Sequence, residues 1–150
     1  MRFQKSKDRR RGFIESHKRL GLNCDEDCIY VTGKLSDVAE ELDFDRALEH
    51  LVGRQGVKSI IALNDIFAIH TINALSRMGV SVPQDVSVIG CDNIQFASMF
   101  NPALTTIDQK QDELSKRAVN MLLDMIEGDK GEPRSKHDII KPELVVRESA

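Results

Sequence analysis

The sequence predicts an α/β protein with a doubly wound, mostly parallel sheet and helices on both faces. Two short apolar runs, VKSIIAL at 57–63 and VSVIG at 86–90, are typical of buried strands. A helical pattern over 66–78 separates them, and strands that alternate with helices are typical of parallel sheets. Because the apolar residues of these runs are continuous and do not alternate, we expect both faces of each strand to be covered.

The first part of the chain continues this alternation. Residues 7–20 read as a helix with apolar residues on one side, and Gly21 is a typical helix stop. The run CIYVT at 28–32 is short and β-branched and predicts a strand. A helix is expected within 36–53, ending at Gly53.

The helix over 66–78 begins after Asn64–Asp65, a pair that offers N-cap side chains, and ends at Gly79. Its expected buried side consists of Ile66, Phe67, Ile69, Ile72, Leu75 and Met78.

Another amphipathic helix is predicted over 112–127. Its apolar stripe consists of Leu114, Ala118, Met121, Leu122 and Met125. Leaving four large side chains in water would forfeit on the order of 6–12 kcal/mol, comparable with the stability of a whole domain. We therefore expect this stripe to be buried on the chain's own sheet or on another copy, and predict self-association through it. The tail HDIIKPELVVRES is expected to return to the sheet as a strand.

Polar pairs follow two of the predicted strands at equivalent points. Asn64–Asp65 comes after one run and Asp92–Asn93 after the next. Ligands of open α/β sheets bind outside the carboxyl ends of the strands, so these pairs can converge on one ligand. Asp and Asn also favour caps and turns for local hydrogen bonds alone, and on pattern we favour a cap for Asp65. Gly90 is expected to let the backbone turn after its strand.

Composition excludes several classes of function. The net charge of −3 argues against a protein that coats nucleic acid, and no apolar run is long enough to span a membrane. The basic N-terminus lacks the apolar region of a secretory signal. Neither a nucleotide-binding glycine motif nor a nucleophile elbow is present, so we expect no cofactor and no catalytic residue. Cys24 and Cys28 lack a neighbouring histidine, and we expect no metal site.

Five motifs occur in order along the chain: R-x-x-G-F from Arg9, ALND-x-x-A at 62–68, MGVSVPQDVSVIGCDN at 78–93, NPALTTIDQ at 101–109 and PELVVRES at 142–149. Together they resemble the C-terminal part of the effector-binding domain of lactose-repressor (LacI/GalR) family transcriptional regulators. The resemblance covers nearly the whole chain. It implies the periplasmic-binding-protein-like type I fold, in which two lobes close on a small molecule and a separate N-terminal helix-turn-helix binds DNA.

The resemblance also implies ligand-binding residues. Arg9 matches an arginine that grips effector oxygens, and a planar fork of donors suits hydroxyls or a carboxylate. Asn64 and Asp92 match positions that contact effector hydroxyls or ring N–H groups. Asn93 is a secondary candidate. Leu35 is another, because GKLSDVAEELDF has no aromatic residue before Phe44, whereas the family often stacks an aromatic side chain on its effector a few residues after Gly33.

The resemblance implies that residues 1–150 are a single partial domain, the C-terminal portion of the effector-binding region and an incomplete C-terminal lobe. The helix 112–127 would belong to the other lobe, and the DNA-binding domain would be absent. We therefore expect the chain to be a fragment or a truncated product.

The function expected is the effector-sensing portion of a bacterial, cytoplasmic, non-catalytic transcriptional regulator. Its expected partners are a small-molecule effector, such as a sugar or nucleoside, and a second copy in a homodimer. Operator DNA would be contacted only through the absent N-terminal domain, and no membrane would be involved. Two alternatives remain: a periplasmic-type solute-binding receptor for a sugar, and a truncated interaction or oligomerisation module without a ligand.

Overall fold

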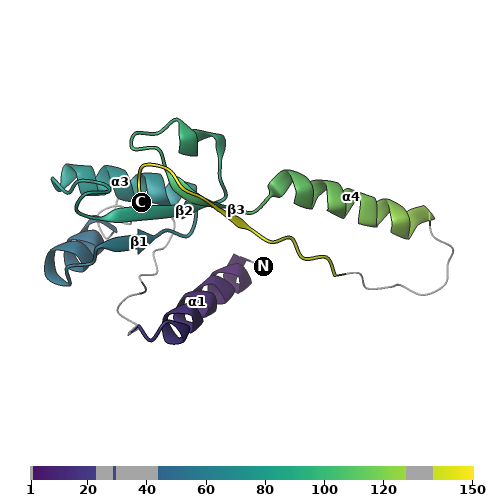
Figure 1. Cartoon of the computed structure of the whole chain (residues 1–150), viewed down its shortest axis with the longest axis horizontal. Coiled ribbons are helices and arrows are strands. Elements are labelled where there is room, and N and C mark those ends of the chain that lie inside the picture. The colour runs from purple at the N-terminus through teal and green to yellow at the C-terminus, as the bar shows by residue number, and fades with distance from the viewer. Residues whose placement is uncertain (1, 23–28, 30–43, 128–136) are drawn as a thin grey trace. The chain divides into compact units, whose positions relative to one another are not determined.

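The computed structural model describes residues 2–22, 29, 44–127 and 137–150 (Figure 1). The chain divides into two compact units, Met1–Lys58 and Ser59–Ala150, and each is described by itself. A search of the described residues for a helix long and apolar enough to cross a membrane finds none.

The first unit begins with α1, Arg2–Arg19, which confirms the predicted helix and starts it earlier. Gly21 has φ +67°, a conformation that favours glycine, and the Leu22 N–H returns to the His17 carbonyl at 2.9 Å. Residues 44–48 are helical and continue into the π-helix η2, Glu49–Arg54, so the helix extends one residue past the predicted stop. The predicted strand 28–32, apart from residue 29, and the segment 36–43 lie outside the described residues.

The second unit is built on a sheet in the order β1-β2-β3-β4. The strand β1, Ser59–Ile61, pairs in parallel with β2, Ser87–Cys91, and β2 pairs in parallel with β3, Thr105–Asp108. The last strand, β4, Glu143–Val145, pairs antiparallel with β3. The predicted α/β class with a mostly parallel sheet is confirmed, as is the returning strand in the tail.

The helix α3, Asp65–Arg77, packs against β2. Its buried residues are Asp65, Ala68, Thr71, Ile72, Ala74 and Leu75. The prediction was right for Ile72 and Leu75 but wrong for Ile66, which is 49% exposed. At 3.6 residues per turn, Ile66 lies about 120° around the helix from Ile72, and small residues fill the side that faces the sheet. The fully buried part of the core lies here, in Leu75, Val86, Val88, Ala97 and Leu104.

The strand β1 is more exposed than its sequence predicts. Ile61 and Leu63 are 56% and 45% exposed, so burial of both faces is wrong for this strand. The reason is its place at the edge of the described sheet, where only β2 lies beside it.

The helix α4, Gln111–Glu127, confirms the predicted helix. Its predicted apolar stripe is not buried on the sheet: Leu114, Leu122 and Met125 are 51%, 57% and 62% exposed, Ala118 is exposed and Met121 half-buried. Of the two alternatives, burial on the chain's own sheet is therefore wrong for the described residues, and burial on another copy stays a prediction.

Candidate functional site

The carboxyl ends of β1, β2 and β3 lie at one edge of the sheet because the three strands are parallel. Polar side chains follow all three strands at this edge. They are Asn64 and Asp65 after β1, Asp92 and Asn93 after β2, and Gln109 after β3. Gln109 is hydrogen-bonded to Asp92, and Asp65 and Asn93 bond to neighbouring residues of the sheet and its loops, so this edge is the candidate site.

Asn64 is the N-cap of α3. Its extended backbone turns the side chain back, and Oδ1 accepts a hydrogen bond from the Phe67 N–H at 2.9 Å. The interpretation of Asp65 as the cap is therefore wrong, since Asn64 fills that role and Asp65 is the first residue of the helix. The effector contact expected of Asn64 stays a prediction.

Asp65 is completely buried and bonds away from its own helix. Its Oδ1 accepts a hydrogen bond from the Thr106 hydroxyl at 2.5 Å, and its Oδ2 accepts one from the Ile94 N–H at 2.8 Å. One carboxylate thus joins α3 to β3 and to the segment after β2.

Gly90 makes room for this carboxylate. The residue lies inside β2, and the backbone turns only after Cys91, so the expectation that Gly90 forms the turn is wrong. A β-carbon at position 90 would stand 3.2 Å from Asp65 Cγ, closer still to Oδ1, and 3.0 Å from a methyl of Leu104. The glycine is required by the space that the buried acid occupies.

The turn itself consists of Asp92 and Asn93, whose φ angles are +117° and +51°. Such conformations cost roughly 1–3 kcal/mol each in residues other than glycine and persist only when their surroundings fix them. Here three consecutive amides are fixed. The Asp92 N–H donates to the Ile107 carbonyl at 2.9 Å, the Asn93 N–H to Thr106 Oγ1 at 3.3 Å, and the Ile94 N–H to Asp65. We call residues 92–94 the edge loop.

The Asp92 side chain is half-buried at this edge, and its Oδ1 accepts a hydrogen bond from Gln109 Nε2. A carboxylate has lone pairs for several donors, so one bond to Gln109 is compatible with further bonds to ligand hydroxyl or N–H groups. The geometry is that of an oriented acceptor at the end of a parallel strand.

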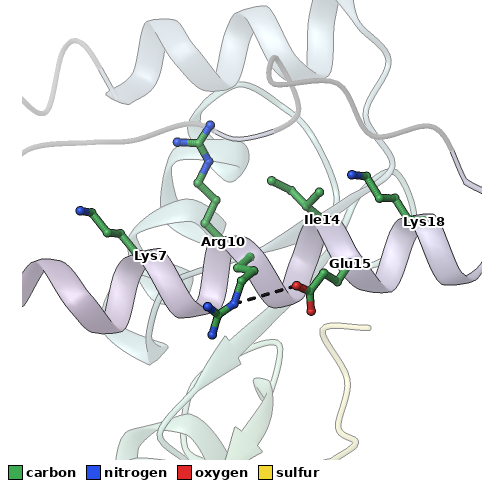
Figure 2. A pocket seen from close by; sticks show the side chains of 6 residues that line it. Lys7, Arg10, Ile14, Glu15 and Lys18 are labelled. Atoms are coloured by element: carbon green, nitrogen blue, oxygen red, sulfur yellow. Dashed lines mark ion pairs between the residues drawn. The ribbon is translucent and has the colours of Figure 1, made fainter.

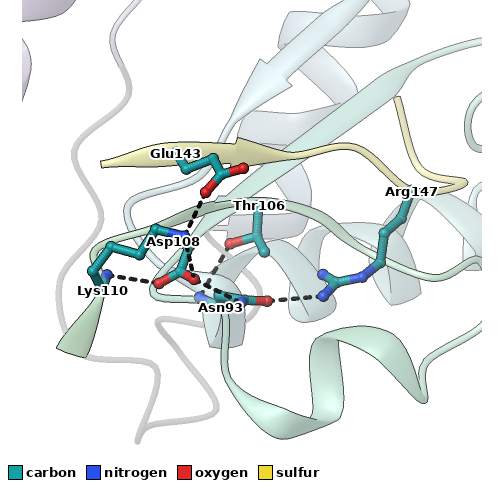
Figure 3. A network of polar contacts seen from close by, with 6 residues as sticks. All are labelled: Asn93, Thr106, Asp108, Lys110, Glu143 and Arg147. Atoms are coloured by element: carbon teal, nitrogen blue, oxygen red, sulfur yellow. Dashed lines mark hydrogen bonds and ion pairs between the residues drawn. The ribbon is translucent and has the colours of Figure 1, made fainter. Parts of the chain in front are cut away.

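Asn93 belongs to a second polar cluster (Figure 3). Its Nδ2 donates to Asp108 Oδ2 at 3.3 Å, and its Oδ1 accepts from Arg147 Nη2 at 2.9 Å. Arg147 also donates from Nη1 to the Leu104 carbonyl at 2.7 Å, so it joins the C-terminal tail both to the edge loop, through Asn93, and to the residue before β3. Both ends of the Asn93 amide thus have partners within the protein, and a contact with an effector stays a prediction.

Charged residues close the same cluster where β3 and β4 meet (Figure 3). The Lys110 N–H donates to Asp108 Oδ1 at 2.7 Å and, with Asn93 and the Lys110 ammonium, lowers the pKa of Asp108 despite its partial desolvation. The Lys110 ammonium pairs with Glu143, which raises the pKa of Lys110.

Arg9 lies half-buried on α1, in the first unit, whereas the other described candidates lie in the second. An open hollow of about 440 Å³ runs along α1, lined by Lys7, Arg10, Arg11, Ile14, Glu15 and Lys18 (Figure 2). All six come from one helix and Arg9 is not among them, so this hollow is an open face of α1 and does not contain the proposed contact. Convergence of Arg9 with Asp92 stays a prediction, and Leu35 lies outside the described residues.

Sequence reasoning missed the residues that build this edge. Asp65 was assigned to the wrong contact, and Thr106, Gln109 and Arg147 were not singled out. All three lie in the motifs NPALTTIDQ and PELVVRES, so the motifs mark their positions but not their partners. The described residues contain no cluster of three metal-ligating side chains.

Comparison with known proteins defines the class. Residues 2–150 match the family described as the periplasmic binding protein-like domain. The chain therefore belongs to the family of periplasmic-binding-protein-like domains, and its open, mostly parallel α/β sheet fits that fold.

The relatives narrow the class to LacI-family regulators. The chain is 35% identical over 144 residues to the HTH-type transcriptional repressor PurR of Actinobacillus pleuropneumoniae serotype 3 (strain JL03), covering 96% of this chain and 42% of the repressor. A LacI-type transcription regulator from Bifidobacterium animalis subsp. lactis DSM 10140 superposes with a TM-score of 0.78 at 33% identity, over 97% of this chain and 50% of that one. The resemblance to part of a LacI/GalR effector-binding domain is confirmed.

A further solved structure contains a ligand. The transcriptional regulator CelR in complex with cellobiose has a TM-score of 0.75 and 26% identity, over 93% of this chain and 41% of that one. The chain thus spans less than half the length of the curated relative and of this regulator.

Proposed function

We propose that this chain is the effector-sensing portion of a cytoplasmic, DNA-binding transcriptional regulator and carries out no catalysis. One observation supports the proposal above the others. Asp92 sits at the carboxyl edge of a parallel sheet, with its backbone held at φ +117° and its carboxylate oriented by Gln109. In a periplasmic-binding-protein-like domain, an oriented acceptor at that edge suits recognition of a ligand rather than its conversion.

The effector class proposed is a sugar or a similar polyhydroxylated molecule, with nucleosides as a second choice. The acceptor chemistry of Asp92 fits ligand hydroxyls, and a structural relative was solved with cellobiose. Arg9 and Asn64 are the further proposed contacts, with Leu35 and Asn93 as secondary ones. Operator DNA would be bound by another part of a longer regulator.

Titration calorimetry tests this proposal. Cellobiose and a panel of monosaccharides, disaccharides and nucleosides are titrated into the wild-type chain, Asp92→Asn, Asp92→Ala and Arg9→Ala. Saturable binding by the wild-type chain that is lost in Asp92→Ala and Arg9→Ala supports the site. Binding that survives both substitutions contradicts it.

Asp85→Asn is the matched control for Asp92→Asn. Asp85 lies before β2, at the opposite end of the strand, where Oδ2 accepts from the Ser81 N–H at 2.8 Å. The two variants remove the same charge from the two ends of one strand. Equal loss of binding in both would show that net charge, rather than the proposed site, governs the affinity.

A second proposal is self-association of the chain through α4. The supporting observation is the stripe of Leu114, Ala118, Met121, Leu122 and Met125, in which Met121 is half-buried and the other four residues are exposed. Leu114, Ala118, Met121 and Met125 are spaced four, three and four residues apart, the spacing of a coiled-coil seam. Covering the large side chains would contribute roughly 1.5–3 kcal/mol each.

The charges flanking this seam favour an antiparallel pairing of two copies. Arg117 and Asp124 lie on the same flank, one on each side of the seam's midpoint. In an antiparallel pair that sets Ala118 opposite Met121, the Arg117 of each copy, which also bonds to Glu113 and Asp138 of its own chain, comes beside the Asp124 of the other. The oligomeric state, measured by light scattering at tens of micromolar, tests this proposal.

A further inference from the structure

We propose that Asp65 is a positioning residue for effector recognition: through Thr106 and the Ile94 N–H it fixes the edge loop and so orients Asp92. The proposal rests on the proposed function, because it assigns the reason why Asp92 faces its ligand in one geometry.

A fully buried carboxylate is tolerated only when its oxygens are satisfied. Asp65 has no exposed surface, and its two oxygens accept from two different elements, Thr106 on β3 and Ile94 in the edge loop. An acid in the first turn of a helix needs no such burial to interact favourably with the helix dipole. The contacts of Asp65 are therefore directed at β3 and the edge loop, away from α3.

The sheet also makes room for this acid. Gly90 lies beside the Asp65 carboxylate in β2, and a β-carbon there would overlap Oδ1. A strand interior is an unfavourable place for glycine. A buried acid and a glycine inside a strand are each unfavourable, and both are needed for the Asp65 carboxylate to reach Thr106 and Ile94.

The contact acts on strained backbone. Asp92 and Asn93 have positive φ, and the next amide, that of Ile94, bonds directly to Asp65. Thr106 extends the link, because its hydroxyl donates to Asp65 and accepts from the Asn93 N–H at 3.3 Å. We call the hydrogen-bonded pair Asp65–Thr106 the anchor. Without it, the Asn93 and Ile94 amides would lose or weaken their hydrogen bonds, and the edge loop could relax to conformations that direct the Asp92 side chain elsewhere.

Thr106→Val is the sharpest variant, because it keeps the shape of the side chain and removes the hydroxyl. Thr105→Val is its matched control. Thr105 is the preceding residue of the same strand, buried to 1% exposure against 0% for Thr106, and its hydroxyl bonds to the tail at the Arg147 N–H. Both variants lose one buried hydroxyl, but only one of these hydroxyls belongs to the anchor. Thr106→Ser restores the hydroxyl.

The exchange rates of the edge-loop amides, measured by NMR, test whether the anchor fixes the loop, and the measurement needs no ligand. In Thr106→Val we expect the Asn93 and Ile94 amides to exchange roughly tenfold faster, the size expected for loss of a hydrogen bond to a charged group. The Val88 amide, which donates to the Ser149 carbonyl at 2.8 Å, is the internal reference and is expected to stay unchanged. Thr105→Val should leave both edge-loop amides as in the wild type, and Thr106→Ser should restore them. Equal acceleration in the two valine variants would overturn the proposal.

Cellobiose titrations then test the link to recognition. We expect Thr106→Val to raise the Kd roughly tenfold or more, with Thr105→Val unchanged and Thr106→Ser close to wild type. A loosened edge loop with unchanged Kd would overturn the positioning role. Failure of the wild-type chain to bind any compound of the panel would count against the proposed function, whereas the exchange measurement decides the anchor by itself.

Discussion

The strand glycine Gly90 and the buried acid Asp65 occupy one space: a β-carbon on residue 90 would overlap the Asp65 carboxylate. Glycine is needed at position 90 because of the space that Asp65, a residue distant in sequence, occupies. It is not needed for backbone conformation, since Gly90 does not have a positive φ. This relationship leads to the first prediction.

Gly90→Ala should destabilise the second unit by about 1–3 kcal/mol, because the methyl group must displace Asp65 or Leu104 from a filled core. Gly12→Ala is the control. Gly12 lies within α1 with nothing within 4 Å of an added β-carbon, so alanine there should add roughly 0.5–1 kcal/mol of helix stability. Urea unfolding measures both. A neutral Gly90→Ala would show that the acid can move aside without cost.

Asn64 has a structural contact and a proposed ligand contact, and two substitutions separate them. Asn64→Ala should cost about 1 kcal/mol, because the Phe67 N–H loses its cap. Asn64→Ser keeps a cap oxygen and should change stability by only a few tenths of a kcal/mol, yet it shortens the side chain. If Asn64 contacts the effector, the serine variant should bind cellobiose more weakly while remaining as stable as the wild type. Wild-type affinity in Asn64→Ser would contradict the ligand contact.

Asp108 should make stability depend on acid pH. Its pKa is lowered in the folded state, first by the Lys110 N–H, from an ordinary value of 3.8. The folded state therefore binds this proton less readily than the unfolded state. The contribution is complete above the ordinary value and is lost as the pH falls through the lowered pKa. Asp108→Asn should flatten this part of the stability curve, and carboxyl NMR titration of the wild type should show a midpoint below 3.8.

Leu114→Ser should reduce self-association if the α4 seam pairs two copies, because it removes an apolar side chain from the contact. Leu123→Ser is the matched control on the same helix. Leu123 is 46% exposed against 51% for Leu114, and at about 100° per residue it lies on the opposite side of α4. Sedimentation velocity at several concentrations distinguishes the two. Equal effects, or a monomeric wild type with α4 exposed, would contradict the pairing.

The sequence predicted much of the fold because the signals were local. Gly21 and Gly79 mark helix ends, and the apolar run containing Val88 forms the central strand. The strand β3 was not predicted, because Thr105 and Thr106 are polar residues that are buried only through hydrogen bonds to the tail and to Asp65.

The residues of the candidate site likewise differ in whether local sequence identifies them. Asp92 could be found from sequence, because its position after a strand is a local property. The roles of Asp65, Gly90 and Arg147 could not, since each depends on a partner far away in the chain. The exposure of Ile61 likewise follows from the position of β1 at the sheet edge, which strand composition does not specify.

The pairing of β3 with β4 has a consequence for chain connectivity. Asp108 and Glu143 stand opposite each other in register, so the chain leaves the sheet and re-enters it at adjacent points. The segment 109–142, which includes α4, thus connects two strands that pair antiparallel as the strands of a β-hairpin do. A two-residue Asn-Gly turn could join those strands directly, because such turns match the twist of antiparallel pairs. Such a turn would remove α4 together with Gln109 and Lys110, so the excursion that contains the helix begins with two residues that bond to Asp92 and Asp108 at the candidate site.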